Sequence, residues 1–599
     1  MSKYDDLSRE QLIALLDKAD RTKKLGLVWE RDEIEADHAV DANFVAATII
    51  PDLSDKPAPW HNMVIEGDNY DALRWLRMTM AGQVKCIYID PPYNTGAKDW
   101  VYNDHYANPE DKYFHSTWLE FLFRRLTLAR DLLAEDGVIL VSINDEQRAK
   151  LELLMDEALP GMRLGSLAWR SRVGSNADQT CFLSQDHEHV LVFGKGGFRF
   201  SGTEKTFAMY RFFDEQRDDH YRLSDLTLGF SWQERPNLYY PLQDPKTGYW
   251  YPCNPNGVWR YASKARSKTT RTKFMEDWLK EERIKFSEDP KVVVWETEED
   301  LRKAVEAGEI PMSGNTPLIS PKLPDFLDWV GRSAAFGTPS FKRYKGELRN
   351  ANQPLSSWIY PRSEAENAQR GENVIVTGTN DEGAKTIRDV FGSKAFNYAK
   401  PVSLIRELVR QTTGPGDTVL DFFAGSATTA QAVIELNAED GFDRRFIMVS
   451  STEATGDDPA KNLCRDVTSE RIRRLNALDD KKFADLSADF AYLRCREIAF
   501  EDLDQTLAPD EVWAALETLH RLPLTRLTQG PWQEHKTVEQ TLIFADKVGQ
   551  DLIDHLRGVV DRRENAFVYA WAPGQITSVL GDGLDVRSVR GELVGRFRQ

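Results

Sequence analysis

The stretch IYIDPPY (residues 87–93) joins an apolar run to an aspartate, two prolines and a tyrosine. The apolar residues predict a buried strand. Two adjacent prolines cannot donate backbone hydrogen bonds, and their rings fix the φ angles, so the end of this strand is a rigid corner. The corner presents a carboxylate, Asp90, and a phenol, Tyr93.

Strands and helices alternate on either side of this corner, in two separate parts of the chain. The first part contains the strand VKCIYID, the helical stretch TWLEFLFRRLTLARDLLAEDG and the strand VILVSI. The second contains TVLDFFAGSATTAQAVIELNAEDG and RRFIMVSSTE, which predict a strand, a loop, a helix and a strand. This spacing is typical of parallel βαβ units, so we expect one α/β sheet that is interrupted by a large insert and then resumed.

The 599-residue chain is too long for a single core. Its composition and periodicity also change along its length, which predicts several domains. From about 165 to 395, aromatic residues, glycines and prolines are frequent and helical periodicity is weaker. The expected parts are an N-terminal helical segment (1–40), a catalytic domain in two halves of one sheet (41–165 and 396–480), an insert (166–395) and a small C-terminal α/β module (481–599).

The composition excludes several classes of protein. A net charge of −18 argues against a uniformly basic surface for nucleic acid, although local basic patches remain compatible with it. Five scattered cysteines without a Cys-x-x-Cys pair favour a reducing cytoplasm and give no reason to expect a metal site. The chain has no apolar run of about 18 residues and no secretory signal, so we expect no contact with a membrane.

The corner at Asp90 has the chemistry to handle an amino group. An exocyclic amine of a nucleic-acid base is a poor nucleophile because its lone pair is delocalised into the ring. Two rigid acceptors outside the base plane, the Asp90 carboxylate and the Pro91 carbonyl, would draw the nitrogen toward tetrahedral geometry. Tyr93 could stack on an extruded base. The alternative without function is a Pro-Pro turn capped by an aspartate.

A second site is indicated by the loop in VLDFFAGSATTAQAV. Gly425 has no side chain, so a ligand can approach the backbone, and the following helix offers free N–H groups. Glu453 ends the next strand, where an acid commonly binds ribose hydroxyls. Each signal alone also fits an ordinary βα turn or a solvated glutamate, but their spacing favours a nucleotide-like cofactor.

Together, IYIDPPYNTG and the later LDFFAGSATT resemble the amino-group DNA methyltransferases in which the catalytic motif precedes the cofactor motif. IEGDNYDAL, DHEHVLVF and NYAKPVSLI resemble further motifs of that family. The length, the large insert and the opening KKLGLVWERDEIE are similar to the modification subunits of type III restriction-modification systems. The resemblance implies a Rossmann-like, S-adenosylmethionine-dependent methyltransferase that modifies N6 of a flipped adenine at specific DNA sites.

The resemblance also implies two sets of site residues, carried over motif by motif. The catalytic set is Asp90, Pro91, Pro92 and Tyr93. The S-adenosylmethionine set is Asp68, Lys400, Pro401, Asp421, Phe422, Ala424, Gly425, Ser426 and Glu453. Within it, Glu453 is expected at the ribose, Asp68 at the adenine, and Lys400 with Pro401 at the methionine end. No metal is expected.

The sequence departs from the family pattern at Ala427, where glycine is usual. Alanine tolerates a positive φ poorly. We therefore expect an altered loop or weaker binding of the cofactor, with activity retained.

Two basic clusters in the insert are expected to contact DNA. Trp259 and Tyr261 are interleaved with the first cluster. Lysine and arginine suit phosphate contacts, and arginine can also pair with guanine edges. The alternative is a solvated charged loop. The expected residues are Arg260, Lys264, Arg266, Lys268, Arg271, Lys273, Lys342, Arg343, Lys345 and Arg349.

The type III resemblance implies three partners: double-stranded DNA, a second copy of the chain, and a restriction subunit with helicase and nuclease activities. The C-terminal module would serve the protein contacts. Two other hypotheses remain open, a recognition subunit whose catalysis is weak or lost, and a solitary methyltransferase or one that acts on RNA. The recognition sequence and the residues that read bases do not follow from the sequence.

Overall fold

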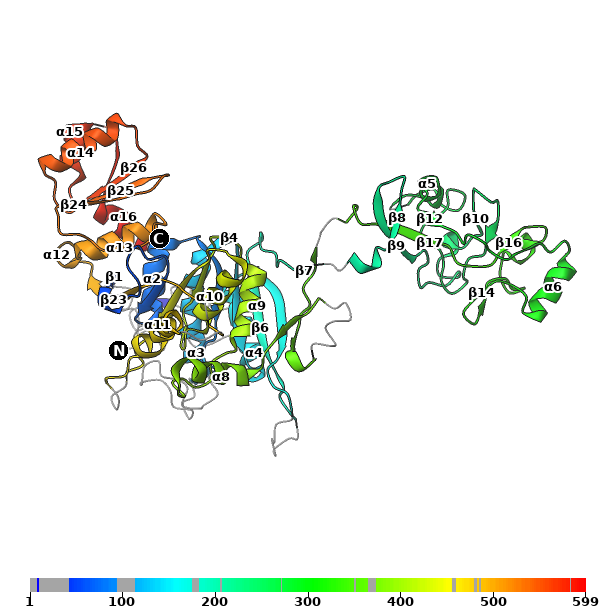
Figure 1. The fold of residues 1–599 in the computed structure, drawn as a ribbon, viewed down its shortest axis with the longest axis horizontal. Helices are drawn as coiled ribbons and strands as arrows, with labels where there is room; N and C mark the ends of the chain where they lie inside the picture. The colour runs from blue at the N-terminus through cyan, green and yellow to red at the C-terminus, as the bar shows by residue number, and fades with distance from the viewer. Residues whose placement is uncertain are drawn as a thin grey trace. The chain divides into compact units, whose positions relative to one another are not determined.

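The computed structural model describes residues 8–9, 43–93, 114–174, 183–204, 207–270, 272–348, 352–364, 373–454, 459–478, 482–483, 486–581 and 583–598. The chain divides into two compact units (Figure 1). One unit consists of Met1–Thr203 with Pro354–Gln599, and the other of Glu204–Gln353. Nearly all of the expected N-terminal helical segment lies outside the described residues.

An 11-stranded sheet organises the first unit. Its order is β1 (Asn43–Ile49), β23 (Ala491–Ala499), β2 (Met63–Glu66), β22 (Arg445–Ser450), β21 (Thr418–Asp421), β3 (Val84–Ile89), β4 (Leu133–Ile143), β6 (His187–Gly194), β5 (Arg163–Arg170), β19 (Trp358–Pro361) and β20 (Ile375–Thr377). The strands from β23 to β4 are parallel, and β6 runs antiparallel to its neighbours β4 and β5. The predicted α/β class is confirmed.

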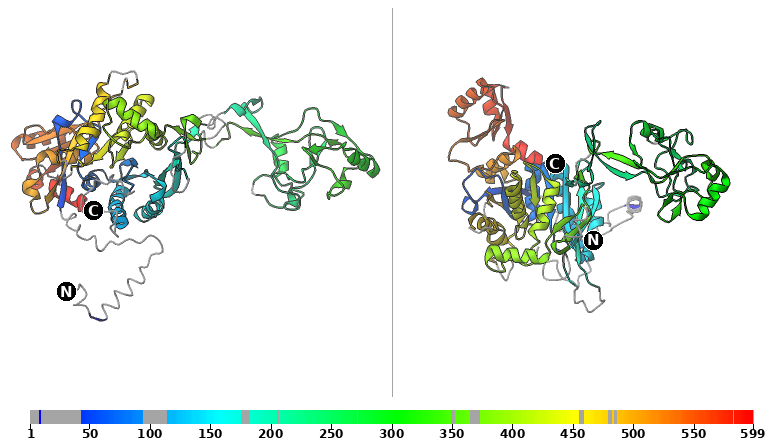
Figure 2. Two further views of the ribbon diagram at one scale, coloured as in Figure 1. Left: turned by 90° about the horizontal axis from the view of Figure 1, so that it is seen from below. Right: turned by 45° about the vertical axis from the view of Figure 1, so that its right-hand side comes forward.

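Strands from distant parts of the chain alternate in this sheet. β22 and β21 lie between β2 and β3, so the two later strands fill a gap that the earlier half leaves open. The views in Figure 2 show the blue-to-cyan and the yellow parts of the chain within this one unit. β21 pairs with β3 in parallel, so the strands that carry the two motifs lie side by side.

Helices cover both faces of the sheet, which explains the nearly continuous apolar run in β3. Ile87 and Ile89 pack into one buried cluster, while Cys86 and Tyr88 pack into the other. The first cluster includes residues of α2 (Asn69–Met80), α3 (Phe114–Leu132), α4 (Asp145–Ala158), α13 (Pro509–Leu519) and α16 (Val589–Arg598). The second includes residues of α8 (Asn380–Phe391), α9 (Val402–Thr412), α10 (Thr428–Asp440) and α11 (Glu470–Ala477).

The C-terminal part has a small sheet of its own. Its strands are β24 (Trp532–Lys536), β25 (Thr541–Ala545), β26 (Ala566–Ala570) and β27 (Asp585–Ser588), with α14 (Gln550–Asp561) and α15 (Pro573–Leu580). The C-terminal module was expected to begin at residue 481, and in the structure it begins later. The reason is that β23 joins the large sheet beside β2 and α13 packs on β1. An alternating strand pattern does not reveal which sheet the strand will join.

The second unit is built from short strands around two small cores. Its α-helices are α5 (Met275–Lys280) and α6 (Glu298–Ala307). Its strands are β8 (Phe212–Asp214), β9 (Asp219–Asp225), β10 (Leu242–Gln243), β11 (Trp250–Tyr251), β12 (Ile284–Lys285), β13 (Val292–Val293), β14 (Met312–Ser313), β15 (Thr316–Pro317), β16 (Ala334–Ala335), β17 (Ser340–Tyr344) and β18 (Asn352–Gln353). The unit is narrower than the expected insert of 166–395, because β6, β19 and β20 belong to the large sheet. Within the described ranges, no helix is both long and apolar enough to cross a membrane.

Candidate active site

The site residues predicted from the sequence follow four neighbouring strands. Asp68 follows β2, Glu453 follows β22, the Asp421–Ser426 loop follows β21, and Asp90 follows β3. These strands are adjacent and parallel, so their carboxyl ends lie at one edge of the sheet. The structure thus brings both predicted sets to the same edge.

The corner after β3 is fixed from α3. The Trp118 indole nitrogen donates a 2.8 Å hydrogen bond to the Pro92 carbonyl. Trp118 is completely buried, so this contact is part of the core. The proline rings and the indole together make the position of Asp90 and Tyr93 rigid.

Four charged or polar side chains meet at this corner. The Tyr93 hydroxyl donates to Asp90 Oδ1 at 2.8 Å and accepts a 2.6 Å hydrogen bond from Lys400 Nζ. Lys400 Nζ also lies 2.8 Å from Glu188 Oε2 and 3.3 Å from Asp90 Oδ1. Its side chain is only 10% exposed, so these contacts are partly shielded from water.

Burial and charge shift the pKa values in this cluster in different directions. Burial raises the pKa of the Asp90 carboxyl, and the Lys400 charge opposes the rise. Burial acts in the same direction on Glu188, but Lys400 and a hydrogen bond from Asn380 lower the pKa of Glu188 overall. Burial would lower the pKa of Lys400, yet the two carboxylates raise it, so Lys400 stays charged.

The Lys400 side chain therefore lies with the catalytic residues. The sequence resemblance implies the methionine end of the cofactor for it, and the structure brings it to Asp90, Tyr93 and Glu188 instead. Its neighbour Pro401 is the N-cap residue of α9.

Asp421 ties the loop after β21 to the following helix. It is 3% exposed, and it accepts hydrogen bonds from Thr429 Oγ1 at 2.6 Å and from the Phe423 N–H at 2.9 Å. Burial raises the pKa of Asp421 to about 7, while these hydrogen bonds oppose the rise and the nearby charge of Asp90 adds to it. The Phe422 carbonyl accepts a 2.9 Å hydrogen bond from the Asn69 amide.

The glycine of this loop adopts the conformation that only glycine takes easily. Gly425 has φ +47°, and a Cβ there would meet Phe396 at 3.1 Å. Ala424 and Ser426 are nearly buried on either side. Ala427 has φ 58° and is completely buried, so the departure from the family pattern does place an alanine in the left-handed region.

A π-helical segment and α11 donate hydrogen bonds to the Asp421–Ser426 loop. Thr468 lies in the π-helical segment Cys464–Ser469 and donates a 2.6 Å hydrogen bond to the Gly425 carbonyl. Arg471 donates to the Ser426 carbonyl at 2.9 Å. Arg471 is fully buried, and burial lowers its pKa to about 9. The path of the loop is therefore set by buried polar contacts.

Asp68, which follows β2, and Glu453, which follows β22, each form an ion pair within the protein. Asp68 caps α2 by accepting from the Tyr70 N–H at 2.7 Å, and it pairs with Arg125 at 2.8 Å. Glu453 has φ 50° and pairs with Lys461 at 2.7 Å. Both acids lie at the sheet edge where the sequence predicts cofactor-binding residues.

Eight of the ten predicted DNA-contacting residues are described, and they fall into three groups. Lys264, Lys273 and Lys342 form ion pairs with Asp277, Glu281 and Asp214. Arg260 and Arg343 bond to the Thr227 carbonyl and the Ser224 hydroxyl. Arg266, Lys268 and Lys345 are exposed, and no ion pair joins them to another described residue. Arg271 and Arg349 lie outside the described residues.

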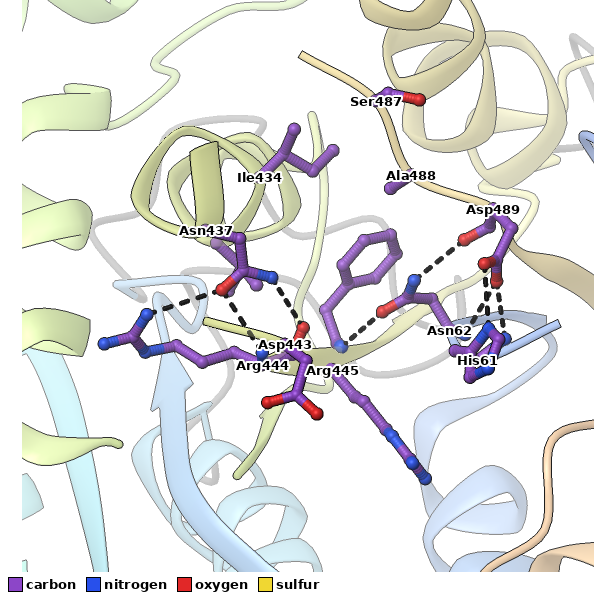
Figure 3. Close-up of a pocket in the computed structure, with 12 residues that line it drawn as sticks. His61, Asn62, Ile434, Asn437, Asp443, Arg444, Arg445, Ser487, Ala488 and Asp489 are labelled. Carbon is purple, nitrogen blue, oxygen red and sulfur yellow. Dashed lines mark hydrogen bonds and ion pairs between the residues drawn. The ribbon is translucent and has the colours of Figure 1, made fainter. Parts of the chain in front are cut away.

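A cavity of about 350 Å³ lies at the opposite edge of the sheet (Figure 3). His61 and Asn62, which line it, directly precede β2, and Arg445 begins β22. Asn62 bridges the Asp489 carbonyl and the Phe446 N–H. The cavity is therefore at the amino ends of these strands, away from Asp90 and the Asp421–Ser426 loop.

Sequence reasoning missed several residues of the site. Glu188 and Asn380 belong to the cluster around Lys400, and Trp118 and Arg471 support the corner and the loop. Only Glu188 carries a visible signal, a carboxylate inside the motif-like strand DHEHVLVF.

Comparison with protein families gives one match that covers both sites. The N6/N4 DNA methylase family, described as DNA methylase, matches residues 84–465. This range is more than half of the 599 residues and contains Asp90 and the Asp421–Ser426 loop.

The curated relatives include subunits of type III restriction-modification enzymes and a type II methyltransferase. The StyLTI Mod subunit of a type III enzyme from Salmonella typhimurium is 28% identical over 455 residues, which are 70% of this chain and 57% of that protein. The EcoPI Mod subunit from Escherichia phage P1 is 29% identical over 429 residues, 65% of this chain and 58% of that protein. The type II methyltransferase M.KpnI from Klebsiella pneumoniae is 28% identical over 438 residues, 69% of this chain and 87% of that protein.

The chain thus spans somewhat more than half the length of the two type III subunits. Among solved structures, the cytosine-N4-specific PvuII DNA methyltransferase matches 72% of this chain and 94% of its own, at 10% identity. The TM-score of that match is 0.31, which is too low to support an argument about the site.

Proposed function

Because the chain belongs to the N6/N4 DNA methylase family, we propose that it methylates the N6 amino group of adenine at specific sites in double-stranded DNA. The family is one of S-adenosylmethionine-dependent methylases. One observation carries the proposal: the rigid Asp90–Tyr93 corner and the Asp421–Ser426 loop follow adjacent parallel strands and so lie at one sheet edge.

The residues beside the corner fit the chemical groups of S-adenosylmethionine. Gly425 has no side chain, and the Phe396 ring lies 3.1 Å from the place where a Cβ would stand. Glu453 and Asp68 offer carboxylate oxygens for ribose hydroxyls and for a base amino group. When bound, S-adenosylmethionine supplies an electrophilic methyl group. We assign to its site Asp68, Pro401, Asp421, Phe422, Ala424, Gly425, Ser426 and Glu453.

The corner residues would prepare the amino group. Asp90 accepts one hydrogen of the amine and the Pro91 carbonyl accepts the other, which exposes the nitrogen lone pair. The nitrogen would form a bond to the methyl carbon as the carbon–sulfur bond of the donor breaks, with S-adenosylhomocysteine as the leaving group. The amine would then lose one proton, and Asp90 is suited to take it because burial raises the pKa of this carboxyl. Tyr93 presents a ring on which a base can stack, and the base must leave the duplex to reach it.

Adenine and cytosine both carry an exocyclic amine, and the corner chemistry suits either. We favour adenine because the first residue of DPPY is aspartate, by analogy with the family members that carry it. N4 of cytosine is the second candidate, since the family match includes N4 methylases.

The type III relatives support the proposal that this chain is a modification subunit. In that role it would bind double-stranded DNA, pair with a second copy of itself and place a restriction subunit with helicase and nuclease activities. The second unit would recognise the target, and Arg266, Lys268 and Lys345 are the exposed cations available for phosphate contacts. The match to M.KpnI, 87% of which is covered, supports a solitary methyltransferase as the alternative.

A weak or inactive catalyst is a further alternative, and one observation favours it. Ala427 lies in the left-handed region directly beside the cofactor loop, where a side chain strains the backbone. In that case the protein would bind DNA without transferring a methyl group.

One experiment separates these candidates. The purified protein is incubated with labelled S-adenosylmethionine and, in parallel, with mixed-sequence duplex DNA or RNA. The nucleosides of the product are identified, beside an Asp90→Ala control. Label on N6-methyladenine that is lost in the control supports the proposal. Label on N4-methylcytosine shifts it to cytosine, label only on RNA overturns it, and DNA binding without label favours the inactive recognition subunit.

A further inference from the structure

Glu188 is a partly buried carboxylate for which the proposed methyl transfer has no role. It lies in β6 between two histidines, and His189 contacts Asp145 of α4 at 3.2 Å. Successive side chains of a strand point to opposite faces, so Glu188 projects away from α4. It points to Lys400, and its side chain is 15% exposed.

Lys400 is shared between two carboxylates. An ammonium group has three hydrogen-bond donors. Here the three acceptors are Tyr93 Oη at 2.6 Å, Glu188 Oε2 at 2.8 Å and Asp90 Oδ1 at 3.3 Å. The shortest contact to a carboxylate is the one to Glu188.

Glu188 is held in place from its other side. The Asn380 amide, at the first position of α8, donates a 3.0 Å hydrogen bond to Glu188 Oε1. One oxygen of Glu188 therefore binds Asn380 and the other binds Lys400. This fixed carboxylate holds the ammonium nitrogen at 2.8 Å, closer than the 3.3 Å that separates it from Asp90.

We propose that Glu188 is a positioning residue for the methyl transfer: it holds Lys400 away from a full pairing with Asp90 and so leaves an Asp90 oxygen for the substrate amine. This inference rests on the proposed function. Without Glu188, the cation would bind Asp90 through a charge-assisted hydrogen bond, which is stronger than the bond of a neutral amine.

The charges around Asp90 predict how its titration responds. Lys400 faces it from the segment before α9, Glu188 from β6, Tyr93 from its own corner, and Tyr88 and Asp421 from β3 and β21. Lys400 lowers the pKa of Asp90, whereas Glu188 raises it. Removal of the two charges must therefore shift the titration in opposite directions.

The first variant is Glu188→Gln, which keeps the size of the side chain. We expect kcat to fall by about tenfold, because Lys400 then occupies Asp90, while KM for DNA and S-adenosylmethionine changes by less than about twofold. The acid limb of the kcat–pH profile moves to lower pH, since Asp90 loses the charge that raises its pKa. Glu188→Asp should restore part of the rate.

The second variant is Lys400→Gln, and the third combines both substitutions. Lys400→Gln moves the acid limb to higher pH, because Asp90 loses the cation that lowers its pKa. In the double variant, loss of the Glu188 charge moves the limb back toward the wild-type position. Glu146→Gln, an exposed acid in the first turn of α4, is the matched control and leaves the profile unchanged.

Several outcomes would overturn the inference. The inference would be wrong if the acid limbs of the kcat–pH profiles of both single variants moved equally in the same direction. It would also be wrong if Glu188→Gln had the wild-type rate and pH profile. A rate loss in Glu188→Gln with an unshifted profile would show a structural role only. Wild-type protein that transfers no methyl group at all would instead refute the proposed function, so the two failures are distinguishable.

Discussion

Leu420 of β21 lies opposite Ile87 of β3 in a parallel register. Asp421 follows Leu420 directly, and Asp90 is the third residue after Ile87. The two acids are close enough that the charge of Asp90 raises the pKa of Asp421. This register places the catalytic corner beside the cofactor loop.

Asp90→Asn removes the negative charge at the corner and keeps the side-chain volume. We expect methyl transfer to fall by about a thousandfold, the size seen when one preorganised acceptor or donor is lost. Binding of S-adenosylmethionine should change by less than about twofold, because Asp90 is not one of its proposed ligands. Labelled methyl transfer and calorimetry measure the two quantities. Retained transfer would place the catalytic acceptor elsewhere.

Ala427→Gly should relieve strain in the cofactor loop. A left-handed φ costs an alanine about 1 kcal/mol more than a glycine, so the free energy of unfolding should rise by about that amount. Urea unfolding measures this change, and S-adenosylmethionine should bind more tightly. Ala430→Gly, within α10 and equally buried, is the matched control and should lower stability by about 1 kcal/mol.

Thr468→Val removes the hydroxyl that binds the Gly425 carbonyl and preserves the shape of the side chain. The carbonyl is then left without this partner, which should cost about 1–3 kcal/mol of stability. The loop should also bind S-adenosylmethionine less tightly. Thermal unfolding and calorimetry are the measurements, and Thr468→Ser, which keeps the hydroxyl, should behave like wild type. Equal losses in the two variants would point to packing and away from the hydrogen bond.

The pKa of Asp421 predicts a pH dependence of stability. Its folded value of about 7 lies above the ordinary value of 3.8, so the folded state holds a proton that the unfolded state releases. Stability therefore falls as pH rises from about 4 to about 7, and the loss is complete above that range, at roughly 1.4 kcal/mol per pKa unit. Asp421→Asn should flatten this slope in unfolding measured without cofactor.

Asp52→Asn is the control for that experiment. Asp52 is an exposed acid in the short helix before β2, and its removal changes the net charge by the same amount. In Asp52→Asn, the change of the unfolding free energy with pH should match that of wild type. A pH dependence of stability that is the same in Asp421→Asn and in wild type would contradict the raised pKa of Asp421.

The catalytic corner and the cofactor loop were predictable because each is a local pattern. In IYIDPPY and LDFFAGSATT, the strand, the turn and the chemical group are adjacent in sequence. The Lys400–Glu188 pair was not predictable, since its members are 212 residues apart. Strand alternation shows that Glu188 faces away from His189, but it does not show what lies opposite.

The limits of the insert were missed for a related reason. β19 and β20 have only four and three residues, and they join the edge of a sheet whose other strands lie far away in the chain. Such short strands gain their stability from the neighbouring strand, so their own sequence carries little signal. The α/β class was predictable because the longer buried strands have recognisable apolar sequences.

The interleaving of β2, β22, β21 and β3 has a consequence for biosynthesis. When the ribosome has released β2 and β3, the two strands that must separate them do not yet exist. At ~5–20 residues per second, the wait for β21 and β22 lasts on the order of tens of seconds. During that time β3 has an unpaired apolar edge, which is a template for aggregation. Nascent chains of this protein should therefore depend on chaperones until residue 450 has emerged, and a truncation before β21 should be insoluble.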